Sequence, residues 1–130
     1  MKQLTRTLSA CALVALLSAT VAFAVDHGPH MSGKFAGPKA NTGTVSHLYE
    51  NNQSILRVST DFKVPDTPAP TWRIVDSKGT IYTLDAFKIK GGEKRQVSVP
   101  GFVRDIAKVQ VYCAWAEVLL GEANFPSAVK

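Results

Sequence analysis

Cys113 is the residue of this chain whose side chain could carry out redox chemistry. It lies in an apolar run, residues 109–116, whose side chains alternate with the period of a β-strand. The other cysteine, Cys11, lies in a segment that we expect to be removed on export, which leaves Cys113 without a partner in the same molecule. A lone cysteine in an exported domain is reactive, pairs between molecules or only fills space.

Strand alternation indicates what surrounds Cys113. It places Cys113 and Trp115 on one face with two valines, and Gln110 and Tyr112 on the other face. The apolar neighbours predict that Cys113 faces the core, where a free cysteine behaves as a small hydrophobic residue with a raised pKa. If the thiol is used instead, Tyr112, Trp115 and Gln110 are the neighbours best placed to shape its surroundings.

Two histidines near the expected mature N-terminus could bind a metal ion. Cleavage after Ala24 would place His27 third from a free α-amine. The amine, two deprotonated amides and the imidazole would then form the square-planar nitrogen set that Cu(II) and Ni(II) prefer, and His30 adds a further donor. The alternative is that both histidines lie in a flexible arm and have no function.

Recognisable catalytic motifs do not accompany these residues. The sequence contains no glycine-rich phosphate loop, no G-x-S-x-G, no H-E-x-x-H and no C-x-x-C. A hydrolase needs a base oriented beside a nucleophile, and His47 is the one histidine inside the predicted domain. We therefore expect a protein that is not an enzyme in its own right.

The first 24 residues have the pattern of a secretory signal peptide. Lys2 and Arg6 precede an apolar stretch over residues 8–23, and Ala22 and Ala24 form an A-x-A cleavage site. The alternative is an N-terminal membrane anchor. The small residues at the end of the stretch favour cleavage, so we expect a periplasmic or secreted protein with no membrane span after processing.

The remaining chain suits one small domain. Cleavage after Ala24 of the 130-residue chain leaves 106 residues, and the formal charge falls from +5 to +3 because Lys2 and Arg6 are removed. The densest basic group, residues 88–95, has no aromatic side chains interleaved with it as a nucleic-acid platform requires. A nucleic-acid partner is therefore not expected.

The order of apolar runs and turn residues predicts an all-β domain. Residues 25–42 lack periodicity and predict a flexible arm. Strands are expected at about ten-residue spacing over residues 43–125, including a hairpin around residues 76–79. We also expect a proline-rich loop at 65–70, a helical turn at 102–106 and a C-terminal tail at 126–130. This pattern is typical of an antiparallel β-sandwich or a barrel.

A series of landmarks along this pattern resembles a known family. The landmarks are Gly43-Thr44-Val45, the strand-like run 56–62 that closes on Asp-Phe, Pro70-Thr71-Trp72, the run 109–113 that ends on Tyr-Cys, and Gly-x-Ala at 121–123. In this order and spacing they resemble the DM13 domain, a β-sandwich module of secreted proteins, over residues 35–125. The resemblance implies a lone cysteine after an aromatic residue and a role in electron transfer.

Different functions follow from these observations. The resemblance implies a redox or electron-transfer accessory protein centred on Cys113, which would need an exported partner protein. The alternative is a non-catalytic binding module that docks a protein partner through a sandwich face or the basic loop at residues 88–95, with Cys113 simply packed. A third reading is an N-terminal arm that binds copper or nickel.

Overall fold

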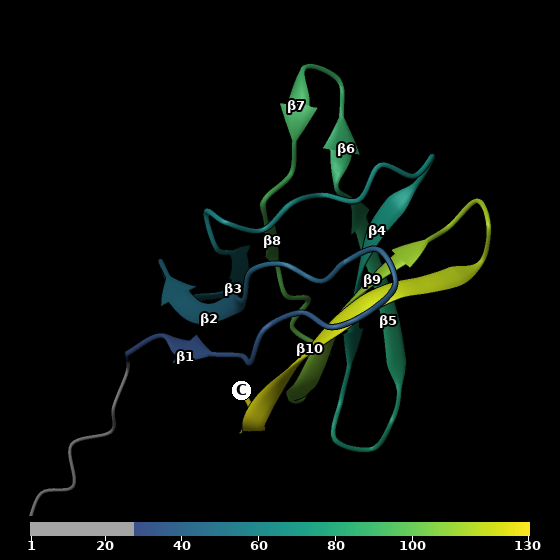
Figure 1. The fold of residues 1–130 in the computed structure, drawn as a ribbon. Helices are drawn as coiled ribbons and strands as arrows, with labels where there is room; N and C mark the ends of the chain where they lie inside the picture. The colour runs from purple at the N-terminus through teal and green to yellow at the C-terminus, as the bar shows by residue number, and fades with distance from the viewer. Residues whose placement is uncertain (1–27) are drawn as a thin grey trace, which may run out of the picture.

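The computed structural model describes residues 28–130, which form strands, turns and loops (Figure 1). The strands are β1 (His30–Met31), β2 (Val45–Glu50), β3 (Gln53–Val58), β4 (Pro70–Val75), β5 (Ile81–Ala86), β6 (Lys88–Ile89), β7 (Gly92–Glu93), β8 (Gln96–Ser98), β9 (Ile106–Cys113) and β10 (Val118–Val129). None of the described residues forms a helix that could cross a membrane. The predicted signal peptide and His27 lie outside the described residues.

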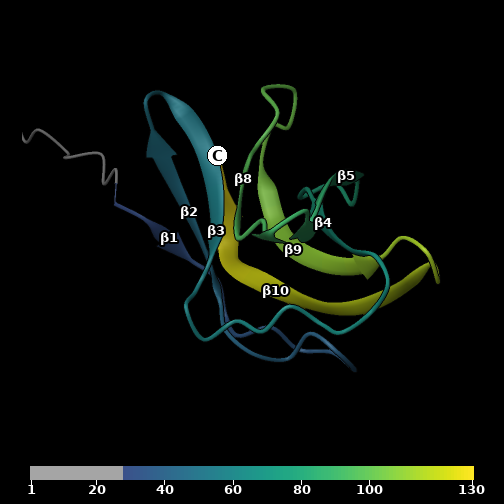
Figure 2. The ribbon, with the colours of Figure 1, turned by 90° about the horizontal axis from the view of Figure 1, so that it is seen from above.

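The strands form two four-stranded sheets and a small hairpin. Sheet A has the order β1-β2-β3-β8, sheet B has the order β10-β9-β4-β5, and β6 pairs with β7. Every strand pairing is antiparallel. Figure 2 shows β1, β2 and β3 on one side and β4, β5 and β9 on the other. The predicted all-β antiparallel sandwich is confirmed.

Side chains from both sheets fill the space between them. Trp72 and Ile74 on β4, Val109 and Val111 on β9, and Leu56 on β3 are all fully buried. Because alternate residues of a strand face the same side, these three strands each supply apolar side chains to the core. The Trp72 ring stacks on Phe87 with 4.4 Å between ring centroids.

The hairpin between β4 and β5 forms where the sequence predicts it. The carboxylate of Asp76 accepts hydrogen bonds from the backbone N–H groups of Lys78 at 2.9 Å and Thr80 at 2.8 Å. Gly79 has a φ of 84°, a conformation that glycine adopts without steric cost. An aspartate that bonds its own turn and a glycine at positive φ are the usual requirements of such a connection.

The segment predicted to be a flexible arm packs against the domain instead. Within its described part, residues 28–42, Phe35 is buried in the core beside Phe62. The N–H of Gly33 donates to Asn124 and that of Ala36 to Glu122, so the segment follows β10. The prediction of a flexible arm is therefore wrong for these residues. The predicted tail, residues 126–130, also differs, because β10 continues to Val129.

Two further local predictions differ from the structure. Residues 102–106 form no helical turn: a turn at residues 101–102 leads to β9, which begins at Ile106. The strand expected over residues 56–62 ends at Val58, and a turn closed by the N–H of Phe62 and the carbonyl of Ser59 carries Phe62 into the core.

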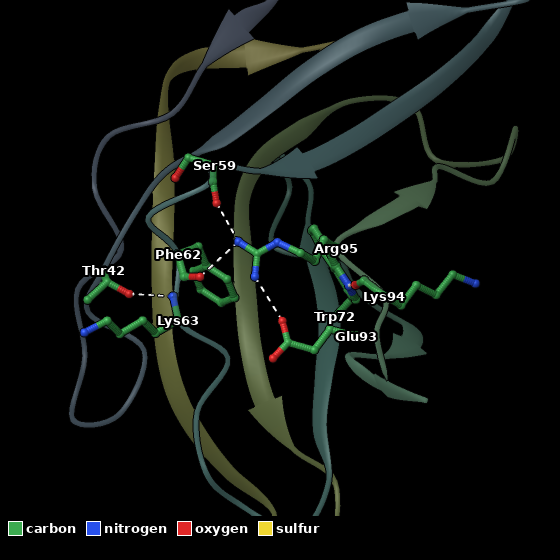
Figure 3. A network of polar contacts seen from close by, with 8 residues as sticks. All are labelled: Thr42, Ser59, Phe62, Lys63, Trp72, Glu93, Lys94 and Arg95. Atoms are coloured by element: carbon green, nitrogen blue, oxygen red, sulfur yellow. Dashed lines mark hydrogen bonds and ion pairs between the residues drawn. The ribbon is translucent and has the colours of Figure 1, made fainter. Parts of the chain in front are cut away.

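An arginine holds this turn in place (Figure 3). One terminal nitrogen of Arg95 donates to the carbonyls of Ser59 at 2.7 Å and Phe62 at 3.0 Å, and the other pairs with Glu93 at 3.0 Å. The forked guanidinium therefore joins the segment before β8 to the turn after β3. In the same region the indole N–H of Trp72 donates to the carbonyl of Lys94 at 2.9 Å.

Candidate functional site

Cys113 is the last residue of β9 and lies at one end of sheet B. It is in register with Pro70, the first residue of β4, and with Val118, the first residue of β10. Within residues 28–130 its thiol forms no disulfide, and the residue is only 1% exposed. The prediction that Cys113 faces the core is confirmed.

The surroundings of the sulfur are more polar than its burial implies. The backbone N–H of Ala116 lies 3.5 Å from Sγ, and the N–H groups of Ala69 and Trp115 and the hydroxyl of Thr67 also favour the thiolate. These donors outweigh burial and lower the pKa of Cys113 below its ordinary value of 9.0. The predicted rise of this pKa is therefore wrong.

Two loops cover the thiol. The turn after β9 folds back through a hydrogen bond from the N–H of Glu117 to the carbonyl of Cys113 at 2.8 Å. The proline-rich loop before β4 is tied to this turn by the N–H of Ala114, which donates to the carbonyl of Ala69 at 2.9 Å. The hydroxyl of Thr67 in the same loop is buried and makes no hydrogen bond within the described residues. The sulfur thus belongs to the buried core cluster and lies beside these two loops at the end of sheet B.

Trp115 lies outside the core. The sequence places it on the same face as Cys113, but β9 ends at Cys113 and Trp115 lies in the turn, where it is 76% exposed. Val118 and Leu119 follow in β10 and are 47% and 41% exposed. We call Trp115, Val118 and Leu119 the apolar tip; it is the end of the β9–β10 hairpin that projects from the body of the domain in Figure 1.

Gln110 and Tyr112 lie on the opposite face of sheet B, as the alternation predicts. The amide Nε2 of Gln110 donates to the carboxylate of Glu122 at 2.9 Å. The guanidinium of Arg73 stacks on the ring of Tyr112, 4.0 Å from its centroid. The two side chains therefore make their contacts away from the sulfur and are not part of its immediate surroundings.

The remaining predicted features are the histidine at position 30 and the basic loop at residues 88–95. His30 lies in β1, opposite His47 of β2. Within residues 28–130 no group of three or more histidine, cysteine, aspartate or glutamate side chains gathers to hold a metal ion. In the basic loop, Lys88, Lys94 and Arg95 pair with Asp66, Asp85 and Glu93. This pairing reduces the positive field that the sequence shows there.

Comparisons with protein-family models, with curated proteins and with solved structures found no match. The resemblance to the DM13 family therefore stays a prediction.

Sequence reasoning missed the contribution of the proline-rich loop to the site. Thr67 and Ala69 approach Cys113 from more than forty positions earlier in the chain. Local periodicity carries no information about such a contact. The one usable signal was the proline spacing at 65, 68 and 70, which predicts a rigid loop and hence a defined cover for whatever lies beneath it.

Proposed function

We propose that this protein is an exported redox accessory protein whose reacting group is the Cys113 thiolate. The observation that carries the proposal is the set of donors around a buried sulfur. A cysteine that only fills space needs apolar contacts, whereas Cys113 receives the N–H of Ala116 at 3.5 Å and has a lowered pKa. The predicted signal peptide and the resemblance to the DM13 domain support the same reading.

The chemistry that fits a lone thiolate is exchange with a disulfide of an exported partner protein. The Cys113 sulfur attacks one sulfur of the partner disulfide, whose S–S bond breaks as a mixed disulfide forms. The second partner sulfur leaves as a thiolate with the bonding electron pair. Because Cys113 is 1% exposed, the cover formed by Thr67 and the turn after β9 must open for this step.

The proposal is tested with iodoacetamide and with oxidised glutathione. The native protein should be alkylated at Cys113 near neutral pH about as fast as a free thiol or faster, and it should form a mixed disulfide with one glutathione by intact mass. The Cys113→Ala variant should do neither. If Cys113 is modified only after denaturation, the redox function is wrong.

A second candidate function is a non-catalytic module that binds a partner protein through the apolar tip. The observation that favours it is the 76% exposure of Trp115 at the end of a hairpin on which Val118 and Leu119 are also exposed. Large apolar groups gathered at one place on a surface mark interaction sites. A Cys113 that stays unmodified in the native protein, together with unchanged stability in Trp115→Ser, would favour this second function.

A further inference from the structure

Two histidines from different strands lie side by side at the edge of sheet A. His30 of β1 and His47 of β2 are directly opposite in the antiparallel register, so their side chains project from the same face. Their rings are stacked, with 5.9 Å between centroids and 26° between planes. The pair is formed by strand pairing and does not depend on where the chain begins.

One ring nitrogen of His47 has no hydrogen-bond partner in the part of the chain that the structure describes. His47 is fully buried, and its Nε2 lies 2.6 Å from the hydroxyl oxygen of Ser54 on β3. Its Nδ1 is also buried and makes no hydrogen bond to any of residues 28–130. Buried polar atoms are nearly always paired, so an orphaned imidazole nitrogen indicates a missing interaction.

The orphaned nitrogen is suited to donate a lone pair. In a neutral imidazole one ring nitrogen carries a proton and donates, while the other carries a lone pair and accepts. When Nε2 carries the proton and donates it to Ser54, Nδ1 carries the lone pair. The two ring nitrogens point in widely different directions. With Nε2 directed at Ser54 of β3, Nδ1 is therefore directed away from Ser54, while the His30 ring is stacked on the His47 ring.

We propose that His30 and His47 form a two-imidazole binding site for a divalent transition-metal cation such as Zn²⁺. Neutral imidazole is the commonest protein ligand for such ions. The ring of His30 is exposed and can turn on its side-chain bonds until one of its nitrogens and Nδ1 of His47 face a common point. Water completes the coordination, since the described residues offer no third ligand of the usual kinds beside the pair.

The ion Zn²⁺ is the appropriate probe because it separates this site from the one predicted at His27. The amine-and-amide set at His27 is square-planar, which suits Cu(II) and Ni(II), whereas Zn²⁺ takes tetrahedral sites of imidazole and oxygen ligands. Zn²⁺ binding to the purified protein is measured by isothermal titration calorimetry at neutral pH. We expect one Zn²⁺ for each chain, and a weakening of at least about tenfold in His30→Ala.

His27→Ala is the matched control, because it removes a histidine three positions away and should leave Zn²⁺ affinity unchanged. His47→Gln should also weaken binding, and its folding is checked by circular dichroism because His47 is buried. In the wild-type protein, Zn²⁺ should shift the imidazole NMR signals of both His30 and His47. Absence of Zn²⁺ binding, equal affinity in His30→Ala, or a loss confined to His27→Ala would each overturn the proposal.

Discussion

The backbone carbonyl of Ala40 lies against Gly121, in the space that a side-chain carbon on residue 121 would occupy. The contact is held by the N–H of Ala40, which donates to the carbonyl of Leu120 at 2.8 Å. It allows the segment before β2 to pack along β10. Glycine is required at residue 121 because any Cβ would meet this backbone.

The first prediction tests this contact. Gly121→Ala should lower the free energy of unfolding by about 2 kcal/mol or more, because the new methyl group must displace backbone rather than a flexible side chain. Chemical denaturation with urea measures the change. Gly101→Ala is the control: beyond its own chain neighbours, no heavy atom of the described residues lies within 4 Å of the added carbon, so its effect should stay within about 0.5 kcal/mol. Equal effects in the two variants would contradict the packing described.

This contact also shows what the sequence could and could not predict. The Gly-x-Ala landmark at 121–123 was visible in the sequence, and so were the strands, because an alternating pattern is a local property. What Gly121 packs against was not visible, because Ala40 lies in a segment with no periodicity. The packing of residues 28–42 depends on single anchors such as Phe35 and on hydrogen bonds to β10.

In the candidate site, too, some features follow from the sequence and others only from the fold. The burial of Cys113 and the separate face of Gln110 and Tyr112 follow from alternation within one strand. The exposure of Trp115 does not, because it depends on where β9 ends and turns. The lowered pKa of Cys113 arises from amides of the turn after β9 and from the loop before β4, and only the folded chain brings these donors to the sulfur.

The second prediction concerns Arg95. Arg95→Lys should cost about 1–2 kcal/mol of stability, since a lysine cannot reproduce the forked contact with the carbonyls of Ser59 and Phe62 and the carboxylate of Glu93. The control is Arg57→Lys. Arg57 has comparable exposure but contacts only the side chains of Glu50 and Gln96, so its change should be about 0.5 kcal/mol or less. Thermal unfolding of the two variants gives the comparison.

The third prediction concerns stability in acid. The hydroxyl and then the backbone N–H of Ser77 donate to the Asp105 carboxylate, at 2.6 and 2.8 Å, and lower its pKa below the ordinary 3.8. A carboxylate with a lowered pKa stabilises the fold above its unfolded pKa, and the contribution is lost as pH falls through the folded pKa. Asp105→Asn should therefore be less stable than the wild type at pH 7, with the difference shrinking below pH 3.8.

Urea denaturation at a series of pH values measures this difference. Asp61→Asn serves as the control, because Asp61 is exposed and accepts a hydrogen bond from the hydroxyl of Ser59 but none from a backbone N–H group of the described residues. A constant difference between wild type and Asp105→Asn across the pH range would show that the hydrogen bonds from Ser77 do not depend on the charge of Asp105.

The fourth prediction concerns the N-terminal histidine. If the chain is cleaved after Ala24, His27 is third from a free amine and the processed protein should bind one Cu(II). A protein with one extra residue before Val25 should lose most of that affinity, because the imidazole is then fourth. Titration followed by visible absorption measures both. Equal Cu(II) affinity in the two proteins would exclude the site, and the Zn²⁺ experiment on His30 would be unaffected by that outcome.

The fifth prediction concerns Thr67 and the reactivity of Cys113. Because donors around the sulfur lower its pKa, the rate of alkylation by iodoacetamide should reach half its maximum at a pH below 9.0. Thr67→Val keeps the shape of the side chain but removes the hydroxyl that favours the thiolate. The midpoint should therefore move to higher pH, and alkylation at neutral pH should slow.

The lowered pKa of Cys113 also predicts how the stability of the protein changes with pH. A thiol whose pKa is lower in the folded protein contributes stability above its unfolded pKa, and loses this contribution as pH falls through the folded value. The wild type should therefore gain stability relative to Cys113→Ala as pH approaches 9.0.

Thr60→Val, which alters an exposed threonine after β3, should leave both the alkylation midpoint and the stability profile unchanged. If Thr67→Val alkylates with the wild-type midpoint, the loop before β4 only covers the thiol and does not tune it.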